Sequence, residues 1–396
     1  MALSPDEYSR LLQFLGQASA YSHHPKEVEH VQTHISHVFI AESLVYKIKK
    51  RVNLGFLDYS TLKKREHYCH REVELNRRLC DDSYLGVVPI TREGDSFALK
   101  GHGEAVEFAV EMKKLQEEFF LNSYIENNSL TRKHLDRIAD TLADFYREQN
   151  PGPEILQYGE IEKIKINTDE NFDQTEEFIG ETLDQLTFDT IRQYTNQYYR
   201  KKEQLFRRRI KQKRIVDGHG DLHLDHIHIT PEKVRIYDCI EFNERFRYGD
   251  LAADLAYLAM DLDFVGRRKE ERYFVAQMST RMEDPDLHRV LDFYKCYRAY
   301  VKGKVKSIQS MEQEVDKADR KEAAQKAARY FDLSLRYALL GSEPVALIFM
   351  GRIGTGKSTL ANKLSEKFEN RIFFFRSYSQ NAGGSAAQTA NTCRAS

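Results

Sequence analysis

The chain has 396 residues, of which 41% are hydrophobic and 31% are charged, and its formal net charge is −1. This length predicts two or three globular domains, and the lack of a basic excess disfavours a nucleic-acid-binding protein. No window approaches the ~18 consecutive apolar residues of a membrane-spanning helix, so we expect no membrane association. The five cysteines are scattered and form no CxxC pair, which predicts free thiols in a reduced, cytoplasmic protein.

The first part of the chain predicts a small lobe of strands with a few helices. Ser4, Pro5 and Glu7 have the capping-box pattern that begins a helix, and the segment lacks the apolar core of a signal peptide. Runs of β-branched and aromatic residues then predict strands. The expected elements are a β-hairpin over 31–50, a helix over 64–80 and strands over 84–90 and 96–112. We therefore expect an α+β lobe over residues 1–115.

The pattern changes to mainly helical after residue 115. Residues 129–149 place apolar side chains three or four positions apart, as one face of a helix requires. Two short strands are expected over 226–230 and 233–240, followed by helices over 250–340. Residues 116–340 should therefore form a second, mainly helical lobe.

A phosphate-binding loop pattern follows the second lobe. The stretch GRIGTGKST at 351–359 matches G-x-x-x-x-G-K-[ST], between an apolar run (344–350) that predicts a buried strand and a segment (358–368) that predicts a helix. Backbone N–H groups of such a loop hold phosphate oxygens, while Lys357 reaches the β and γ phosphates and Ser358 ligates Mg²⁺. The predicted phosphate-binding residues are Gly351, Gly354, Gly356, Lys357, Ser358 and Thr359.

The chain ends at Ser396, too soon after this loop for the parallel sheet that a P-loop domain needs. We interpret residues 341–370 as a truncated P-loop segment that packs on the first domain or stays mobile. Residues 371–396 are polar and rich in small residues, which predicts disorder. Our hypothesis for the origin of this tail is a one-base frameshift in the gene. When the tail is back-translated with ordinary codons and read one base later, the resulting sequence resembles the continuation of a P-loop kinase.

The segment richest in chemistry is DGHGDLHLDHIHI at 217–229, followed by YDCIEFN at 237–243. Phosphoryl transfer needs a carboxylate that orients or deprotonates the attacking hydroxyl, ligands for Mg²⁺ and a lysine for the phosphates. Asp221 lies in a tight loop between histidines, and Asp238 ends a strand shortly afterwards. The two carboxylates can therefore serve as base and metal ligand.

HGDLH resembles the catalytic loop of the aminoglycoside phosphotransferase and choline kinase group, which has a two-lobed protein-kinase-like fold and the pattern H-G-D-x-H-x-x-N. The resemblance implies that the catalytic residues are Asp221, as the base, with His219 and His223 on either side of it, and that Asp238 binds metal. VYKIKK resembles the strand with the phosphate-binding lysine. The implied nucleotide-binding residues are Lys47, its helix partner Glu72, and Glu111 and Met112 at the hinge that accepts adenine.

The segment NLGFLDYSTLKKR at 53–65 resembles a family of bacterial two-part proteins, in which an aminoglycoside phosphotransferase-like domain is fused to a P-loop ATP-binding or kinase domain. This resemblance extends from about residue 5 to Phe368. Two features depart from the pattern. His226 occupies the metal-binding asparagine position, and the stretch 33–39 contains no glycine to cover the phosphates.

Several residues have alternative interpretations. Asp221 could be an ordinary turn residue without a catalytic role, and Lys47 could be a solvated surface lysine. Glu241 and Asn243 either extend the metal site or fix the following loop. Asp250, which lies on the same predicted helix segment as Asp254, suits helix capping or support of the catalytic loop. A zinc site is a further interpretation of the local histidines, which are His219, His223, His226 and His228.

The sequence favours an ATP- and Mg²⁺-dependent phosphotransferase that acts on a hydroxyl of a small molecule, with nucleotide and acceptor as its partners. A nucleotide-binding pseudokinase that regulates or scaffolds an attached P-loop ATPase or kinase domain is the alternative, because His226 and the glycine-free loop weaken the case for catalysis. The acceptor and the oligomeric state stay open.

Overall fold

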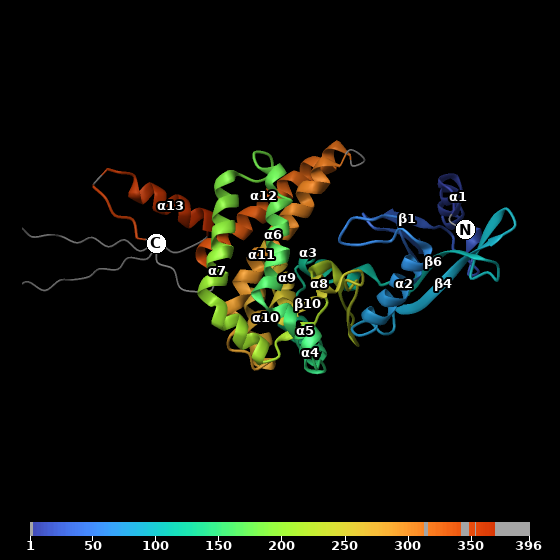
Figure 1. Ribbon diagram of the computed structural model, residues 1–396, viewed down its shortest axis with the longest axis horizontal. Coiled ribbons are helices and arrows are strands. Elements are labelled where there is room, and N and C mark those ends of the chain that lie inside the picture. Colours follow the sequence, from blue (N-terminus) through green and yellow to red (C-terminus); the bar gives the residue numbers. More distant parts are fainter. Residues whose placement is uncertain (1–2, 313–315, 342–347, 353, 369–396) are drawn as a thin grey trace, which may run out of the picture. The chain divides into compact units, whose positions relative to one another are not determined.

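The computed structural model describes residues 3–312, 316–341, 348–352 and 354–368. The chain divides into two compact units, Met1–Ser342 and Glu343–Ser396. The first unit contains a sheet-based lobe followed by a helical lobe, and the second contains the helix α13 (Figure 1). The predicted tail over 371–396 and most of the predicted strand over 344–350 lie outside the described residues.

The first lobe is built on a six-stranded antiparallel sheet in the order β1-β2-β3-β6-β4-β5. The strands are β1 (Glu29–Gln32), β2 (Ser36–Ala41), β3 (Leu44–Lys49), β4 (Tyr84–Glu93), β5 (Ser96–Leu99) and β6 (Ala105–Lys113). The predicted hairpin over 31–50 is confirmed as β2 and β3. The single strand expected over 96–112 is instead two strands, because a glycine-containing turn at 100–104 interrupts it.

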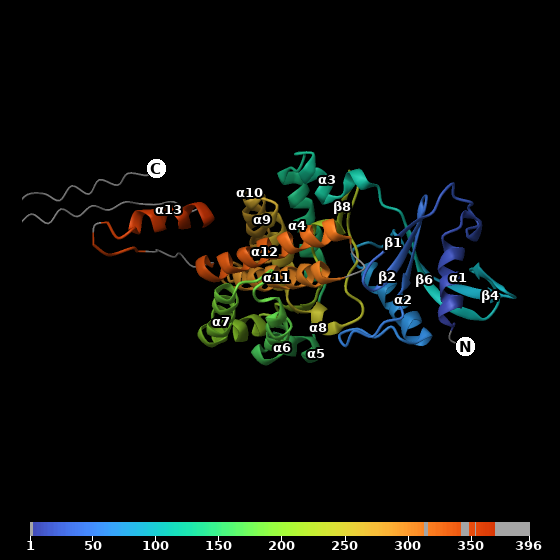
Figure 2. The same ribbon diagram turned by 90° about the horizontal axis from the view of Figure 1, so that it is seen from above.

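Two helices cover opposite faces of this sheet (Figure 2). α1 (Pro5–Leu15) begins with the predicted capping box, in which Ser4 Oγ accepts a hydrogen bond from the Glu7 N–H and the Glu7 carboxylate accepts one from the Ser4 N–H. α2 (Leu62–Asn76) packs on the other face through Cys69 and Val73. Since strand side chains alternate between faces, Tyr46 of β3 faces α1 while its neighbour Lys47 faces α2.

The second lobe is mainly helical and has one extensive apolar core. Its helices are α3 (Leu121–Glu126), α4 (Arg132–Arg147), α5 (Pro153–Leu156), α6 (Ile161–Asp173), α7 (Gln185–Lys211), α8 (Glu244–Arg247), α9 (Leu251–Phe264), α10 (Arg268–Arg281), α11 (Leu287–Met311) and α12 (Lys317–Leu340). α11 and α12 lie side by side in both views (Figures 1 and 2).

Two short antiparallel strand pairs lie within this lobe and hold the segment that is richest in chemistry. β7 (Ile215–Asp217) pairs with β10 (Tyr248–Asp250), and β8 (Ile227–Ile229) pairs with β9 (Val234–Ile236). The loop after β7 and the loop after β9 therefore lie at neighbouring positions. Arg78, just after α2, donates hydrogen bonds to the carbonyls of Asp217 and Gly218 and so ties the sheet-based lobe to the first of these loops.

The second unit contains the predicted loop-to-helix junction, with α13 over Lys357–Phe368. The buried strand expected before it is not confirmed. Residues 348–350 have no strand structure, and the side chains of Ile348 and Met350 are 78% and 87% exposed. No neighbouring strand among the described residues pairs with this segment, so it has no sheet in which to be buried.

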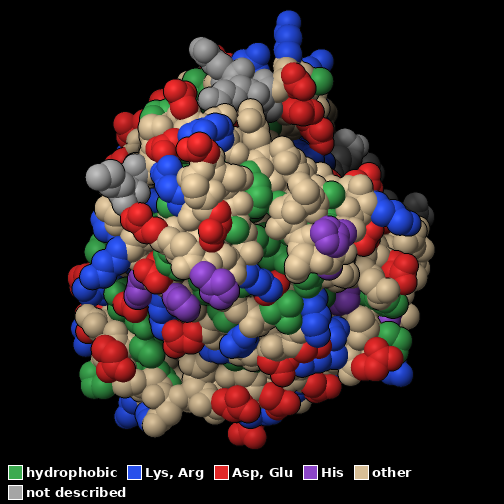
Figure 3. Space-filling view, turned by 90° about the vertical axis from the view of Figure 1, so that its right-hand side faces the viewer, with side chains coloured by type: hydrophobic (Ala, Val, Ile, Leu, Met, Phe, Trp, Pro, Cys, Tyr) green, Lys and Arg blue, Asp and Glu red, His purple; other side chains and the backbone are tan. Residues whose placement is uncertain are grey.

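Among the described helices, none is both long enough and apolar enough to cross a membrane. Figure 3 shows acidic and basic side chains interspersed over the face that it displays, with several histidines among them. This face therefore carries charges of both signs.

Candidate functional site

The loop after β7 is held by a buried carboxylate from α9. Asp254 accepts hydrogen bonds from the backbone N–H groups of His219 (2.6 Å) and Gly220 (2.7 Å). Gly220 has a φ of +83°, and a Cβ there would lie 2.9 Å from the Phe246 carbonyl oxygen, so both conformation and space require glycine. These contacts present Asp221 at the tip of a rigid turn. The support of this loop was predicted for Asp250, whereas the structure gives it to Asp254.

His219 is fully buried and braces the same loop. Its Nε2 donates to the Tyr237 carbonyl at 2.9 Å, and its Nδ1 accepts from the Asp221 N–H at 3.3 Å. Burial lowers the pKa of this imidazole, so the ring is neutral. Because both ring nitrogens are occupied, we assign His219 a positioning role in place of the predicted catalytic one.

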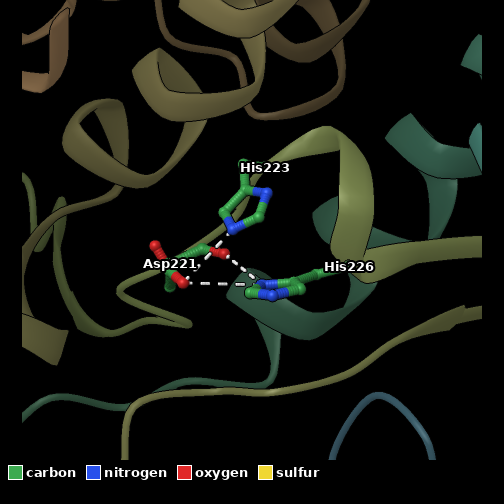
Figure 4. Close-up of side chains that lie close together, drawn as sticks. All are labelled: Asp221, His223 and His226. Atoms are coloured by element: carbon green, nitrogen blue, oxygen red, sulfur yellow. Dashed lines mark hydrogen bonds and ion pairs between the residues drawn. The ribbon is translucent and has the colours of Figure 1, made fainter. Parts of the chain in front are cut away.

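His223 lies between the carboxylates of Asp221 and Asp225, and Figure 4 shows it beside Asp221 and His226. Its Nε2 is 3.4 Å from Asp221 Oδ2, and its Nδ1 is 3.3 Å from Asp225 Oδ2. Burial lowers the pKa of His223, but Asp221 and Asp225 outweigh this and raise it to about 9. Burial likewise acts to raise the pKa of Asp221, yet the His223 charge holds it well below its usual range. Asp221 is therefore an ionised carboxylate beside an imidazolium.

In contrast to His223, the His226 ring is neutral. Its Nδ1 donates to the Asp221 backbone carbonyl at 2.9 Å, and its Nε2 lies 3.6 Å from Asp238 Oδ2. Burial, followed by the charge of His223, lowers the pKa of His226 to about 4. The two rings lie 3.8 Å apart between centroids, so one charged and one neutral imidazole are in contact.

The four-histidine zinc site is wrong for the described structure. Both nitrogens of His219 are used within the loop, and Nε2 of His228 donates to the Gln116 carbonyl at 3.1 Å. Among the described residues, the group with metal-ligating atoms within 4.8 Å of one another is Asp221, His223 and His226.

Lys47 of β3 reaches this loop from the other lobe. Its Nζ lies 2.6 Å from Asp238 Oδ1 and 2.9 Å from Glu72 Oε1, and its side chain is 13% exposed. Burial acts to lower the pKa of Lys47, but the Asp238 and Glu72 carboxylates raise it well above its ordinary value. Lys47 is thus not a solvated lysine. The structure brings together Lys47, Glu72, Asp221, His226 and Asp238 from four separate segments, since Asp221 and His226 lie on one loop.

Asp238 adopts a left-handed conformation, with a φ of +62°, in the loop after β9. Its backbone N–H donates to the Tyr84 hydroxyl at 3.2 Å. Such a φ is uncommon for a residue with a side chain and is typical of functional positions. Burial opposes ionisation of Asp238, but Lys47 and His226 lower its pKa below the ordinary range, so the carboxylate is charged.

Lys49 is a second buried lysine that the sequence analysis missed. Its Nζ lies 2.8 Å from Glu72 Oε2 and also binds Glu241 Oε1, which accepts a 2.5 Å hydrogen bond from the Tyr59 hydroxyl. The signal was available, because residues two apart on a strand share a face. Glu241 therefore fixes its loop by pairing with Lys49, and Asn243 caps α8 and donates to the Phe56 carbonyl. Asp250 caps α9 through the Ala252 N–H.

The predicted hinge residues separate onto two faces of β6. The Glu111 carboxylate accepts hydrogen bonds from Tyr46 (2.9 Å) and Lys100 (2.7 Å), on the face opposite Lys47. Met112 lies on the α2 face, beside the cluster that contains Val110. The Glu111 side chain is therefore turned away from Lys47, and contact with adenine at this strand remains a prediction for its backbone and for Met112.

The loop between β1 and β2 takes a tight turn without glycine. Thr33 Oγ1 accepts from the Ser36 N–H at 3.0 Å, and His34 Nδ1 lies 3.2 Å from Glu312 Oε1 at the end of α11. The stretch that lacks glycine in the sequence is therefore a short turn, and the tip of this turn contacts the helical lobe.

The predicted P-loop residues belong to the second unit. Gly351, Gly354 and Gly356 all have positive φ, as the pattern requires. Lys357 Nζ donates to the Arg352 carbonyl at 2.5 Å, within the loop itself, while Ser358 and Thr359 begin the helix and are exposed.

The first unit fits a divalent cation. Asp238 Oδ2 and His226 Nε2 both present lone pairs and face each other, and a pair of acceptors at 3.6 Å calls for a positive species between them. Carboxylate and imidazole are both established metal ligands.

Comparisons with known proteins agree with this geometry. Residues 64–293 match the phosphotransferase enzyme family. The uncharacterized protein Rv2004c of Mycobacterium tuberculosis (strain H37Rv) is 32% identical over 335 residues, covering 85% of this chain and 64% of that protein. The uncharacterized protein Mb2027c of Mycobacterium bovis matches with the same values. The chain thus spans 64% of the length of these relatives.

Two solved structures are similar to the chain at low identity. The GDP complex of aminoglycoside 2'-phosphotransferase-IIIa has 14% identity and a TM-score of 0.48, covering 81% of this chain and 98% of that one. A choline/ethanolamine kinase family protein from Mesorhizobium loti has 12% identity and a TM-score of 0.47, covering 84% of this chain and all of that one, 100%.

Proposed function

The chain belongs to the phosphotransferase enzyme family, and from this premise we propose that it transfers the γ-phosphoryl group of ATP, with Mg²⁺, to a hydroxyl of a small molecule. The observation that carries the proposal is the convergence of Lys47, Asp238 and Asp221, in which the first two lie 191 residues apart in the chain and 2.6 Å apart in space. These are the parts that phosphoryl transfer requires: a phosphate-binding cation, a metal ligand and a carboxylate base.

In the proposed reaction, the acceptor hydroxyl oxygen forms a bond to the γ-phosphorus, and the bond from that phosphorus to the β–γ bridging oxygen breaks. ADP leaves with the electron pair, and the proton of the hydroxyl passes to a carboxylate oxygen of Asp221. The depressed pKa of Asp221 makes it a weak base. Its main contribution is therefore to orient the hydroxyl, with proton transfer late in the reaction.

Lys47 supplies the charge that binds the phosphates. In the structure this charge is shared by Asp238 and Glu72, so nucleotide phosphates compete with Asp238 for Lys47 while Glu72 keeps the lysine in place. A cation held by Asp238 and His226 would neutralise phosphate charge when it is bound. We also propose that residues 341–370 form a P-loop segment whose lysine, Lys357, is not the main phosphate-binding group of this chain.

The test is calorimetry of ATP binding to the full chain in the presence of Mg²⁺. We expect binding that Asp238→Ala reduces by about 10- to 100-fold, because a charged ligand of the cation is lost. Asp173→Ala is the matched control, since Asp173 is exposed at the end of α6, and it should bind as the wild type does. A folded wild-type chain that binds no ATP would refute the proposal.

A nucleotide-binding pseudokinase is the second candidate, favoured by His226 at a position where the resembled pattern has asparagine. Asp221→Asn distinguishes the two functions once an acceptor screen has found turnover. In an enzyme it should lower phosphoryl transfer by about 10² to 10⁴-fold and leave nucleotide affinity within a factor of about two. An absence of transfer to every class of acceptor, with normal ATP binding, favours the pseudokinase.

A further inference from the structure

The tautomer of His226 is fixed by its neighbours. A backbone carbonyl oxygen can only accept a hydrogen bond, so the 2.9 Å contact with the Asp221 carbonyl requires a proton on Nδ1. In a neutral ring the lone pair then lies on Nε2. This is the nitrogen that faces Asp238 Oδ2 at 3.6 Å.

The neighbouring ring is directed at other carboxylates. His223 Nε2 lies 3.4 Å from Asp221 Oδ2, and His223 Nδ1 lies 3.3 Å from Asp225 Oδ2. The centroids of the His223 and His226 rings are 3.8 Å apart. The two rings therefore lie in contact, and it is the Nε2 atom of His226 that faces Asp238.

The donors left for a cation are therefore of two kinds. The nitrogens of His223 are directed at Asp221 and Asp225, although His223 belongs to the group whose ligating atoms lie close together. Asp238 keeps Oδ2 available while its Oδ1 is bound by Lys47. The remaining converging lone pairs are a carboxylate oxygen of Asp238 and the Nε2 nitrogen of His226.

Mg²⁺ prefers an all-oxygen, octahedral set of ligands, whereas first-row transition-metal ions accept imidazole nitrogen readily. On the premise of the phosphotransferase function above, we propose that His226 Nε2 is a direct ligand of the nucleotide-bound cation, and that the site therefore prefers a first-row transition-metal ion such as Mn²⁺ over Mg²⁺.

The experiment is pulsed electron paramagnetic resonance of Mn²⁺ bound to the full chain with a non-hydrolysable ATP analogue. The protein carries ¹⁵N-labelled histidine, so a coupling from imidazole is distinct from any coupling of adenine nitrogen. We expect a ¹⁵N coupling in the wild type that is absent in His226→Asn and retained in His67→Asn, since His67 is an exposed histidine of α2. Competition by Mg²⁺ should show the preference for Mn²⁺ falling by about tenfold in His226→Asn.

Loss of the coupling in His226→Asn assigns it to His226, and a coupling that persists in this variant would overturn the inference. The absence of a coupling in the wild type is decisive whether or not the variant folds. Mn²⁺ and nucleotide bound together without a histidine coupling would overturn this inference and leave the phosphotransferase function standing. Failure of the folded chain to bind nucleotide with either ion would overturn both.

Discussion

Lys47 and Lys357 are the two lysines that phosphate-binding patterns single out, and their surroundings differ. Lys47 lies in the first unit with carboxylate oxygens of Asp238 and Glu72 at 2.6 and 2.9 Å. Lys357 begins α13 in the second unit, and its ammonium donates to the Arg352 carbonyl of its own loop. Among the described residues, carboxylates surround Lys47 but not Lys357.

The difference shows what a short motif determines. The P-loop pattern predicts a local shape, and among the described residues Gly354 and Gly356 have φ values of +83° and +79° and α13 follows them. A working phosphate site also needs cation ligands and a base, which come from distant segments. In the first unit we propose that the fold supplies them, because the loops after β7 and β9 meet β3 and α2.

The largest expected effect comes from the carboxylate that both buried lysines share. Glu72→Gln should lower the free energy of unfolding by about 3 kcal/mol, because it leaves two buried ammonium groups with one carboxylate partner fewer. Chemical denaturation followed by circular dichroism measures this. Glu74→Gln is the control on the same helix, where a side chain that is 65% exposed pairs with Arg71. Glu74→Gln should lower the free energy of unfolding by less than about 1 kcal/mol. Equal losses of stability in the two variants would show that the ion pairs of Glu72 with Lys47 and Lys49 stabilise the fold no more than an exposed ion pair does.

The next effect concerns the support of the catalytic loop. Asp254→Asn replaces a double acceptor by a group with one acceptor and one donor, so the N–H groups of His219 and Gly220 cannot both be satisfied. We expect phosphoryl transfer to fall by about 10²-fold while nucleotide affinity stays near that of the wild type. Steady-state kinetics measure the rate of phosphoryl transfer, and calorimetry measures the nucleotide affinity. A loss of nucleotide binding equal to the loss of transfer would contradict a positioning role.

The third effect is a pH dependence that arises from His223. Its pKa is raised from the usual 6.5 to about 9 in the folded chain, so the stabilisation is fully present below pH 6.5 and is lost as the pH rises through about 9. His223→Gln should flatten this part of the stability profile. NMR titration of the histidine rings should show one group near 9 and, for His226, one near 4. Titration of both rings near their usual value would refute the assigned charge states.

The sequence predicted the elements that local patterns define. The capping box at Ser4, the hairpin of β2 and β3, and the positions of Lys47 and Asp221 in strand and loop follow from short-range rules. The second lysine of β3 could have been found from the strand period, since Lys49 shares a face with Lys47.

Other features depend on contacts that no local pattern encodes. The charge states of His223 and His226 differ because Asp225 faces one ring and a backbone carbonyl faces the other. The orientation of Glu111 depends on which face of the sheet carries α1. Such features are set by tertiary packing, and they decide which motif residues can act together.

The central claim is that the nucleotide phosphates bind at Lys47 rather than at Lys357, and calorimetry of ATP binding to the full chain tests it directly. We predict that Lys47→Ala weakens binding by about 10- to 100-fold, because a charge-assisted contact is lost, and that Lys357→Ala changes it by less than about twofold. Circular dichroism confirms that both variants are folded. The reverse result, with binding lost only in Lys357→Ala, would contradict the account and assign the nucleotide to the second unit.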